Sequence, residues 1–155
     1  MTGRSVPHCP SARPEHPHAV VIGVVGGTAT EPRVGFLGDA LPVTDEVLAM
    51  TGPVTPTEVL RVAAPCAGSR CRHFEDATCL LATKIVRLLP VVSDDLPACP
   101  IRGSCRWFAQ EGGAACRRCP QVVTENWHPS PAMAVAAHPD VTPADAARRM
   151  ERSDG

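Results

Sequence analysis

Seven of the eight cysteines in this 155-residue chain lie within about a third of its length. These seven are Cys66, Cys71, Cys79, Cys99, Cys105, Cys116 and Cys119. In a reducing compartment, clustered cysteines are more often metal ligands or redox groups than structural disulfides. The sequence therefore predicts that sulfur atoms between positions 66 and 119 converge on an inorganic centre. Cys9 stands alone, far from the others in the sequence, and is not assigned to this centre.

The downstream cysteines follow the pattern Cys99-x5-Cys105-x10-Cys116-x2-Cys119. Four thiolates suit either a [4Fe–4S] cluster or a tetrahedral zinc ion. Cys99 and Cys119 each precede proline, as the last cysteine of bacterial ferredoxin runs does. The ferredoxin spacing itself is absent, so this local similarity assigns no family. The Cys-Pro pairs and the long, uneven spacings favour a [4Fe–4S] cluster, with zinc as the alternative.

An upstream group follows the pattern Cys66-x4-Cys71-x-His73-x5-Cys79. Three thiolates and one imidazole would make a zinc site, and they could also hold a cluster. A further alternative is that a single [4Fe–4S] cluster uses four of the seven cysteines. The other cysteines would then pack as small apolar side chains.

Positive charge gathers around these cysteines. Five arginines adjoin them in the sequence: Arg70, Arg72, Arg106, Arg117 and Arg118. Between positions 66 and 119 there are eight Lys or Arg and five Asp or Glu, although the whole chain has a net charge of −1. Nearby cations stabilise thiolates and a negatively charged centre. The same excess could face a phosphate or an acidic partner, but the whole-chain charge does not argue for nucleic acid or an anionic membrane.

The rest of the chain has limited means to build a core. Aromatic residues make up only 3% of it, and it contains 17 prolines and 12 glycines. Large aromatic side chains bury the most area per residue, while proline interrupts helices and strands. Such a chain is expected to need a staple, such as a bound metal. The predicted fold class is therefore a small, irregular, metal-stapled α+β domain, with an N-terminal β-hairpin followed by short helices and with disordered termini.

Four regions are predicted along the chain. They are a disordered leader at 1–18, a small α/β segment at 19–64, a cysteine-rich metal-binding domain at 65–127, and a tail at 128–155. The tail is rich in proline and alanine and is expected to act as an exposed linker with a short helix near its end.

Within these regions, residue patterns predict two strands and four helices. The strands are expected at 19–25 and 33–37, and the helices at 44–50, 55–64, 76–89 and 102–111. Thr44 is the expected N-cap of the first helix, and Thr55 and Glu58 form a capping box for the second. In the third helix, an apolar stripe is expected along one face, and Lys84 lies away from it. The stripe consists of Leu81, Ile85, Leu88 and Leu89.

The apolar run at 19–25 is far too short to span a bilayer, and the leader before it does not resemble a signal peptide. A cytoplasmic protein is therefore expected. The chain has one Lys against fourteen Arg, with abundant Ala, Pro and Val. That bias is typical of GC-rich coding and suggests a bacterial source.

These features predict an accessory iron–sulfur protein with a [4Fe–4S] cluster on the downstream cysteines. It would transfer electrons to a partner protein or redox enzyme, sense redox state, or support the maturation of a partner. The alternative is a structural zinc module that docks on protein or nucleic acid; nucleic acid is the less favoured partner, and no membrane partner is expected. A thiol oxidoreductase using Cys116 and Cys119 is disfavoured because no βαβ pattern surrounds them. No nucleophile–base arrangement indicates an enzyme.

Overall fold

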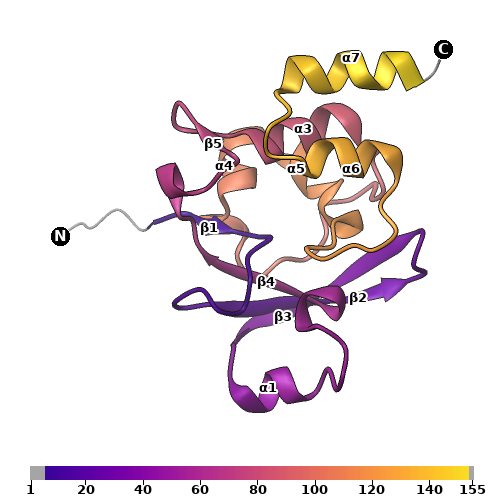
Figure 1. Ribbon diagram of the computed structural model, residues 1–155. Coiled ribbons are helices and arrows are strands. Elements are labelled where there is room, and N and C mark those ends of the chain that lie inside the picture. The colour runs from indigo at the N-terminus through magenta and orange to yellow at the C-terminus, as the bar shows by residue number, and fades with distance from the viewer. Residues whose placement is uncertain (1–5, 154–155) are drawn as a thin grey trace.

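The predicted hairpin forms one half of the larger sheet. In the computed structural model, which describes residues 6–153, β2 (Val20–Gly27) pairs antiparallel with β3 (Pro32–Pro42). β4 (Leu60–Pro65) pairs with the other edge of β2, and β1 (His8–Cys9) pairs with β4. The result is a four-stranded antiparallel sheet in the order β1-β4-β2-β3 (Figure 1). The prediction of a mixed α+β fold with an N-terminal hairpin and short helices is confirmed.

The turn between β2 and β3 requires its glycine. Gly27 has a φ of +77°, a left-handed conformation that residues with a Cβ rarely adopt. A Cβ at this position would lie 2.4 Å from the Glu31 carbonyl oxygen. β2 runs past its predicted end because the ladder continues to this turn, where Gly27 is opposite Pro32. β3 runs past its predicted end at the other end of the ladder, where Pro42 is opposite Val20.

Both predicted helix starts near the hairpin are present, but the second helix is shorter than predicted. The Thr44 side chain caps α1 (Asp45–Ala49), and α2 (Pro56–Val59) opens with the predicted capping box. The prediction of helix up to residue 64 is wrong, because Leu60–Pro65 forms β4. All residues of β4 except the last are buried. Burial on both faces of a central strand outweighs the local helix signal.

The helices that follow form a second layer. They are α3 (Leu80–Leu88), α4 (Arg106–Glu111), α5 (Gly113–Cys116), α6 (Pro131–Ala137) and α7 (Pro143–Ser153). Figure 1 shows α3, α5 and α6 above the sheet, α7 beyond them, and α1 on the opposite side of the sheet. Among residues 6–153, no helix has the length and apolar character needed to cross a membrane.

The helices predicted at 76–89 and 102–111 both begin later than expected. A short hairpin of β5 (Phe74–Glu75) and β6 (Thr78–Cys79) precedes α3. Asp76 and Ala77 at its turn have φ values of 51° and 62°, the pair of left-handed residues that a type I′ turn requires. The helix predicted at 102–111 is divided into the 3-10 turn η2 (Arg102–Ser104) and α4, with Cys105 between them.

Part of the predicted disordered leader is ordered. Cys9 lies opposite Ala64 in the β1–β4 ladder, and the Ala12 N–H donates to the Val62 carbonyl. Ala12 is also buried in the smaller of two cores, on the face of β4 that carries Val62. Pairing with β4 therefore fixes a segment that has no periodicity of its own. Residues 1–5 of the predicted leader lie outside the described residues.

The C-terminal tail is more structured than a linker. Ser130 caps α6, and Met133 and Ala136 on that helix are buried in the larger core, which lies between the sheet and the helices. The predicted short helix near the end is α7, where Ala146 is fully buried. A few buried apolar residues therefore hold α6 and α7 against the rest of the protein. They are Met133 and Ala136 on α6 and Ala146 on α7.

Lys84 links this tail to α3. Its side chain is completely buried, contrary to its predicted place away from the apolar stripe. Its Nζ donates to the carbonyl oxygens of His138 and Val141 at 2.7 and 2.8 Å. Burial lowers the pKa of Lys84, although the neighbouring Cys79 and Asp140 act in the opposite direction. The two hydrogen bonds hold the connection between α6 and α7 against α3.

Replacing Lys84 by Met is expected to lower the free energy of unfolding by about 2–3 kcal/mol, because two buried carbonyls lose a charged donor. Arg87→Met, at an exposed position of the same helix, should change it by less than about 0.5 kcal/mol. Urea unfolding followed by circular dichroism measures both variants. Equal effects of the two substitutions would show that Lys84 does not hold the tail in place.

Candidate metal centres

The four downstream cysteines line a single cavity. Cys99 lies in the loop after α3, Cys105 directly precedes α4, Cys116 ends α5, and Cys119 begins the 3-10 turn η3 (Cys119–Gln121). The cavity measures about 20 Å³, close to the space of one water molecule. Organic ligands occupy pockets of roughly 300 Å³ or more. The size and the four sulfurs together favour an inorganic group over an organic ligand.

Apolar side chains form most of the remaining wall of this cavity. They include Ile22 and Phe36 from the sheet and Trp107, Phe108 and Ala115 from the helices. Burial raises the pKa of the Cys105 thiol to about 11, and it also raises the pKa of Cys99. A thiolate at either position therefore needs a positively charged neighbour.

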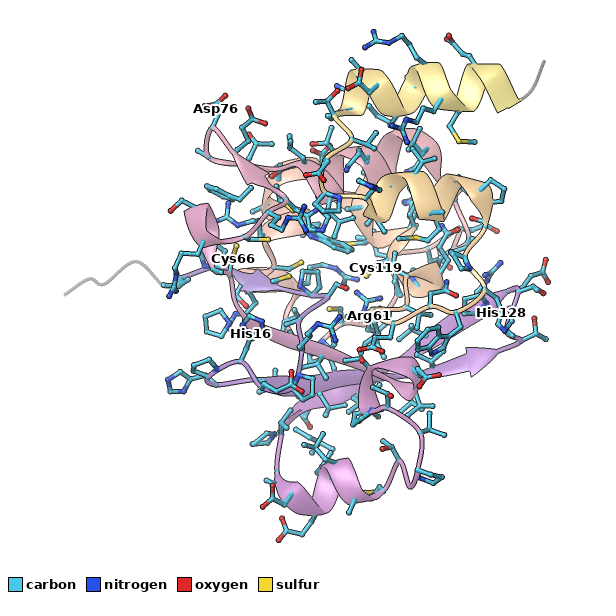
Figure 2. The ribbon with its side chains drawn as sticks, viewed as in Figure 1. His16, Arg61, Cys66, Asp76, Cys119 and His128 are labelled. Atoms are coloured by element: carbon cyan, nitrogen blue, oxygen red, sulfur yellow. The ribbon has the colours of Figure 1, made fainter. Side chains whose placement is uncertain are left out.

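Arg61 supplies a positive charge at this site, and the sequence analysis does not identify it. It extends from β4, is completely buried, and uses all five of its N–H donors. Four bonds go to the carbonyl oxygens of Pro10, Cys119 and Val122 at 2.8 to 3.0 Å. The fifth, from Nη2, reaches Cys119 Sγ at 3.1 Å. Figure 2 shows Arg61 and Cys119 close together between the sheet and the helices.

Among residues 6–153, no carboxylate forms an ion pair with Arg61. Its guanidinium carbon lies 5.9 Å from the ring centres of both Phe36 and Trp107, so two cation–π contacts stabilise it in part. A buried cation without an anion is strongly unfavourable. The nearby sulfurs are the groups that can carry the balancing negative charge. The sequence does carry one signal for the burial of Arg61, because this arginine stands inside the apolar run at 60–64.

The predicted upstream residues Cys66, Cys71, His73 and Cys79 line a second cavity, of about 630 Å³. The 3-10 turn η1 (Gly68–Arg70) reverses the chain between Cys66 and Cys71. The hairpin β5–β6 then brings Cys79 opposite Phe74. Short turns closed by backbone hydrogen bonds therefore collect these residues on one cavity wall.

Cys9, which stands alone in the sequence, lines the same cavity. The β1–β4 ladder places it there, and the Cys66 N–H extends the pairing by donating to the Pro7 carbonyl at 2.7 Å. Burial raises the pKa of the Cys9 thiol to about 12; the Ser11 backbone N–H opposes this, and the nearby Cys79, Cys66 and Cys71 thiols add to it. Cys9 also precedes a proline, as Cys99 and Cys119 do. That shared dipeptide is the sequence signal that could have grouped it with them.

An arginine also meets a sulfur in the upstream cavity. Arg106 Nε donates to Cys66 Sγ at 3.1 Å, and the Gly68 N–H approaches the same sulfur at 3.4 Å. The guanidinium carbon lies 5.0 Å from the centre of the Phe74 ring. Figure 2 shows Cys66 in the same layer between sheet and helices as Cys119.

His73 lies on the wall of the upstream cavity, and its Nδ1 is buried without a hydrogen-bond partner in the described part of the chain. Burial lowers the pKa of its imidazole, and the charges of Lys84 and Arg72 lower it further. Both effects favour the neutral ring, the form in which an imidazole binds a metal. Whether it binds a metal stays a prediction.

All eight cysteines are free thiols. Among residues 6–153, no three His, Cys, Asp or Glu side chains form a group that could hold a metal ion as they stand. The structure thus shows two sets of four cysteines around two cavities, and metal stapling of the fold stays a prediction.

Comparison of the chain with protein-family models, with curated proteins and with solved structures found no match.

Arg61→Met is expected to lower the free energy of unfolding by about 3–5 kcal/mol, because the buried carbonyl oxygens of Pro10 and Val122 lose a charged donor. Arg61→Lys should fall between Met and the native residue, since an ammonium keeps the charge but has only three donors. Arg33→Met, at an exposed position of β3, serves as the control and should change the stability by less than about 0.5 kcal/mol. Urea unfolding provides the comparison. Native stability in Arg61→Lys would mean that the five-bond network does not hold the site.

Proposed function

We propose that Cys99, Cys105, Cys116 and Cys119 bind a [4Fe–4S] cluster and that the protein is an accessory electron carrier for a partner protein. The observation that carries this proposal is the buried Arg61 guanidinium, which lies against the Cys119 sulfur and has no carboxylate partner in the described part of the chain. Sensing of redox state, or maturation of a partner, would use the same centre.

Charge balance supports a cluster on these four residues. A [4Fe–4S] group bound by four thiolates has a net formal charge of roughly −2 in its oxidised form. Arg61 provides one positive charge inside the apolar layer, and Arg102 lies on the cavity wall as a second. The raised pKa values of Cys99 and Cys105 describe thiols that hold their protons. Iron would take the place of those protons when it binds.

The surroundings of the four sulfurs suit reversible one-electron chemistry, which a bound cluster would supply. The potential of such a cluster depends on hydrogen bonds to its sulfurs and on its exposure to solvent. Arg61 donates one of these hydrogen bonds, and Trp107, only 2% exposed, keeps water from one side of the cavity. Electron transfer requires no substrate pocket, and the cavity of about 20 Å³ would have to widen around the cluster as iron replaces the thiol protons.

A partner would approach where the site is closest to solvent. Cys99 and Cys116 are only partly buried, and Arg117 beside Cys116 is exposed. A partner with an acidic contact surface would complement this charge and be steered toward it. The protein would work in a reducing compartment such as the cytoplasm, where its thiols stay available for iron.

Protein prepared without oxygen is expected to be brown, with broad absorption near ~400 nm that fades on reduction with dithionite, as is usual for clusters held by four cysteine thiolates. Cys116→Ser should lose the iron bound at this site. Arg117 lies between Cys116 and Cys119 in the sequence, but its side chain is exposed. The variant Arg117→Gln should therefore keep that iron. Analysis of iron, zinc and acid-labile sulfide, with an absorption spectrum, measures the three proteins.

Colourless protein with one equivalent of zinc would identify a structural zinc module and contradict the proposed function. An iron content that Cys116→Ser leaves unchanged would contradict the assignment of the ligands.

A further inference from the structure

We infer that Cys9, Cys66, Cys71 and Cys79 bind a second [4Fe–4S] cluster, which makes this chain a two-centre iron–sulfur protein. The inference rests on the proposed function, because it assigns the same cofactor to the second set. It departs from the sequence prediction, which places His73 and not Cys9 among the upstream ligands. Both sets of four cysteines are built with the same three devices.

The first device is a Cys-Pro-X segment. Cys9 is followed by Pro10 and Ser11, and Cys99 by Pro100 and Ile101. Proline fixes its own φ and has no N–H. The next backbone N–H, of Ser11 or Ile101, is the one that lowers the pKa of the thiol against the effect of burial, in both sets.

The second device is a cysteine directly before a helix. Cys79 precedes α3, and Cys105 precedes α4. The backbone N–H groups of the first helical turn lower the pKa of each thiol against the effect of burial, those of Leu81 and Ala82 for Cys79 and those of Trp107 and Phe108 for Cys105. Such donors stabilise a thiolate more than a thiol, because bonds to a charged acceptor are stronger.

The third device is an arginine N–H at a sulfur. Arg106 donates to Cys66 and Arg61 donates to Cys119, each at 3.1 Å. The ion pairs among residues 6–153 include neither arginine. Each guanidinium also lies over an aromatic ring, Phe74 for Arg106 and Trp107 for Arg61. Cysteines that only fill space would need none of these donors, since a buried thiol is a weak acceptor.

One residue in each set remains after these pairs are formed. It is Cys71 upstream and Cys116 downstream, and each lines the same cavity as its three partners. Each set therefore provides four sulfurs, the number that a [4Fe–4S] cluster takes. His73 is not required to complete the upstream set.

The two sets are also neighbours. Trp107 lines both cavities, and the consecutive residues Cys105 and Arg106 serve one set each. Two clusters held in this way would share a wall, which is the arrangement that electron exchange between them needs.

The test is an iron count on the full chain prepared without oxygen. The native protein is expected to hold about eight iron and eight sulfide per chain, four of each per cluster. Cys9→Ser and Cys99→Ser should each reduce the iron about twofold, and the double variant should remove it. His73→Ala, on the wall of the same cavity as Cys9, is the matched control and should keep the native count. The spectrum of the cluster that remains shows whether each single variant is folded.

About four iron per native chain, with none lost in Cys9→Ser and all lost in Cys99→Ser, would overturn the second cluster and leave the first. Native protein without iron would overturn both. Half the iron lost in His73→Ala but none in Cys9→Ser would overturn Cys9 as the fourth ligand. If Cys9→Ser does not fold, the native count of eight or four still decides between one cluster and two.

Discussion

The buried guanidinium of Arg61 is the interaction on which the rest of the structure depends. It joins the N-terminal segment at Pro10, its own strand β4, and the cysteine-rich segment at Cys119 and Val122. An arginine loses its hydration on burial, so each of its N–H groups needs an acceptor inside the protein. The hydrogen bonds from Arg61 therefore fix three segments that are distant in the sequence in one arrangement. It also places a positive charge at a sulfur.

Lys84 plays the corresponding role at the other end of the chain. Its ammonium holds the carbonyls of His138 and Val141 against α3, while Arg61 holds that of Pro10 against β4. The buried apolar residues are mostly small, with Ala and Val outnumbering every larger type. Such side chains bury little area each. Buried cations bonded to backbone carbonyls therefore help to fasten both terminal segments to a small core.

The same cations explain how cysteines can gather in an apolar layer. Burial is the main cause that raises the pKa values of Cys9, Cys79, Cys99 and Cys105, since a charged sulfur is unfavourable away from water. Arg61 and Arg106 each direct an N–H at a sulfur, and Lys84 lies near Cys79. The net charge of −1 for the whole chain conceals this positive interior. It is the electrostatic setting that a thiolate-bound centre would require.

The sequence by itself determined the features that near neighbours decide: the hairpin, the Thr44 cap and the Thr55–Glu58 capping box. Turns and caps depend on residues within three or four positions, so local pattern suffices. Only the tertiary structure decided that the run after Val59 is a strand, that Cys9 joins the upstream cysteines, and that Arg61 is buried. Arg61 and Cys119 are 58 positions apart, and Cys9 meets its set by pairing with β4. Such contacts depend on which strands pair and which faces are buried, and no local pattern carries that information.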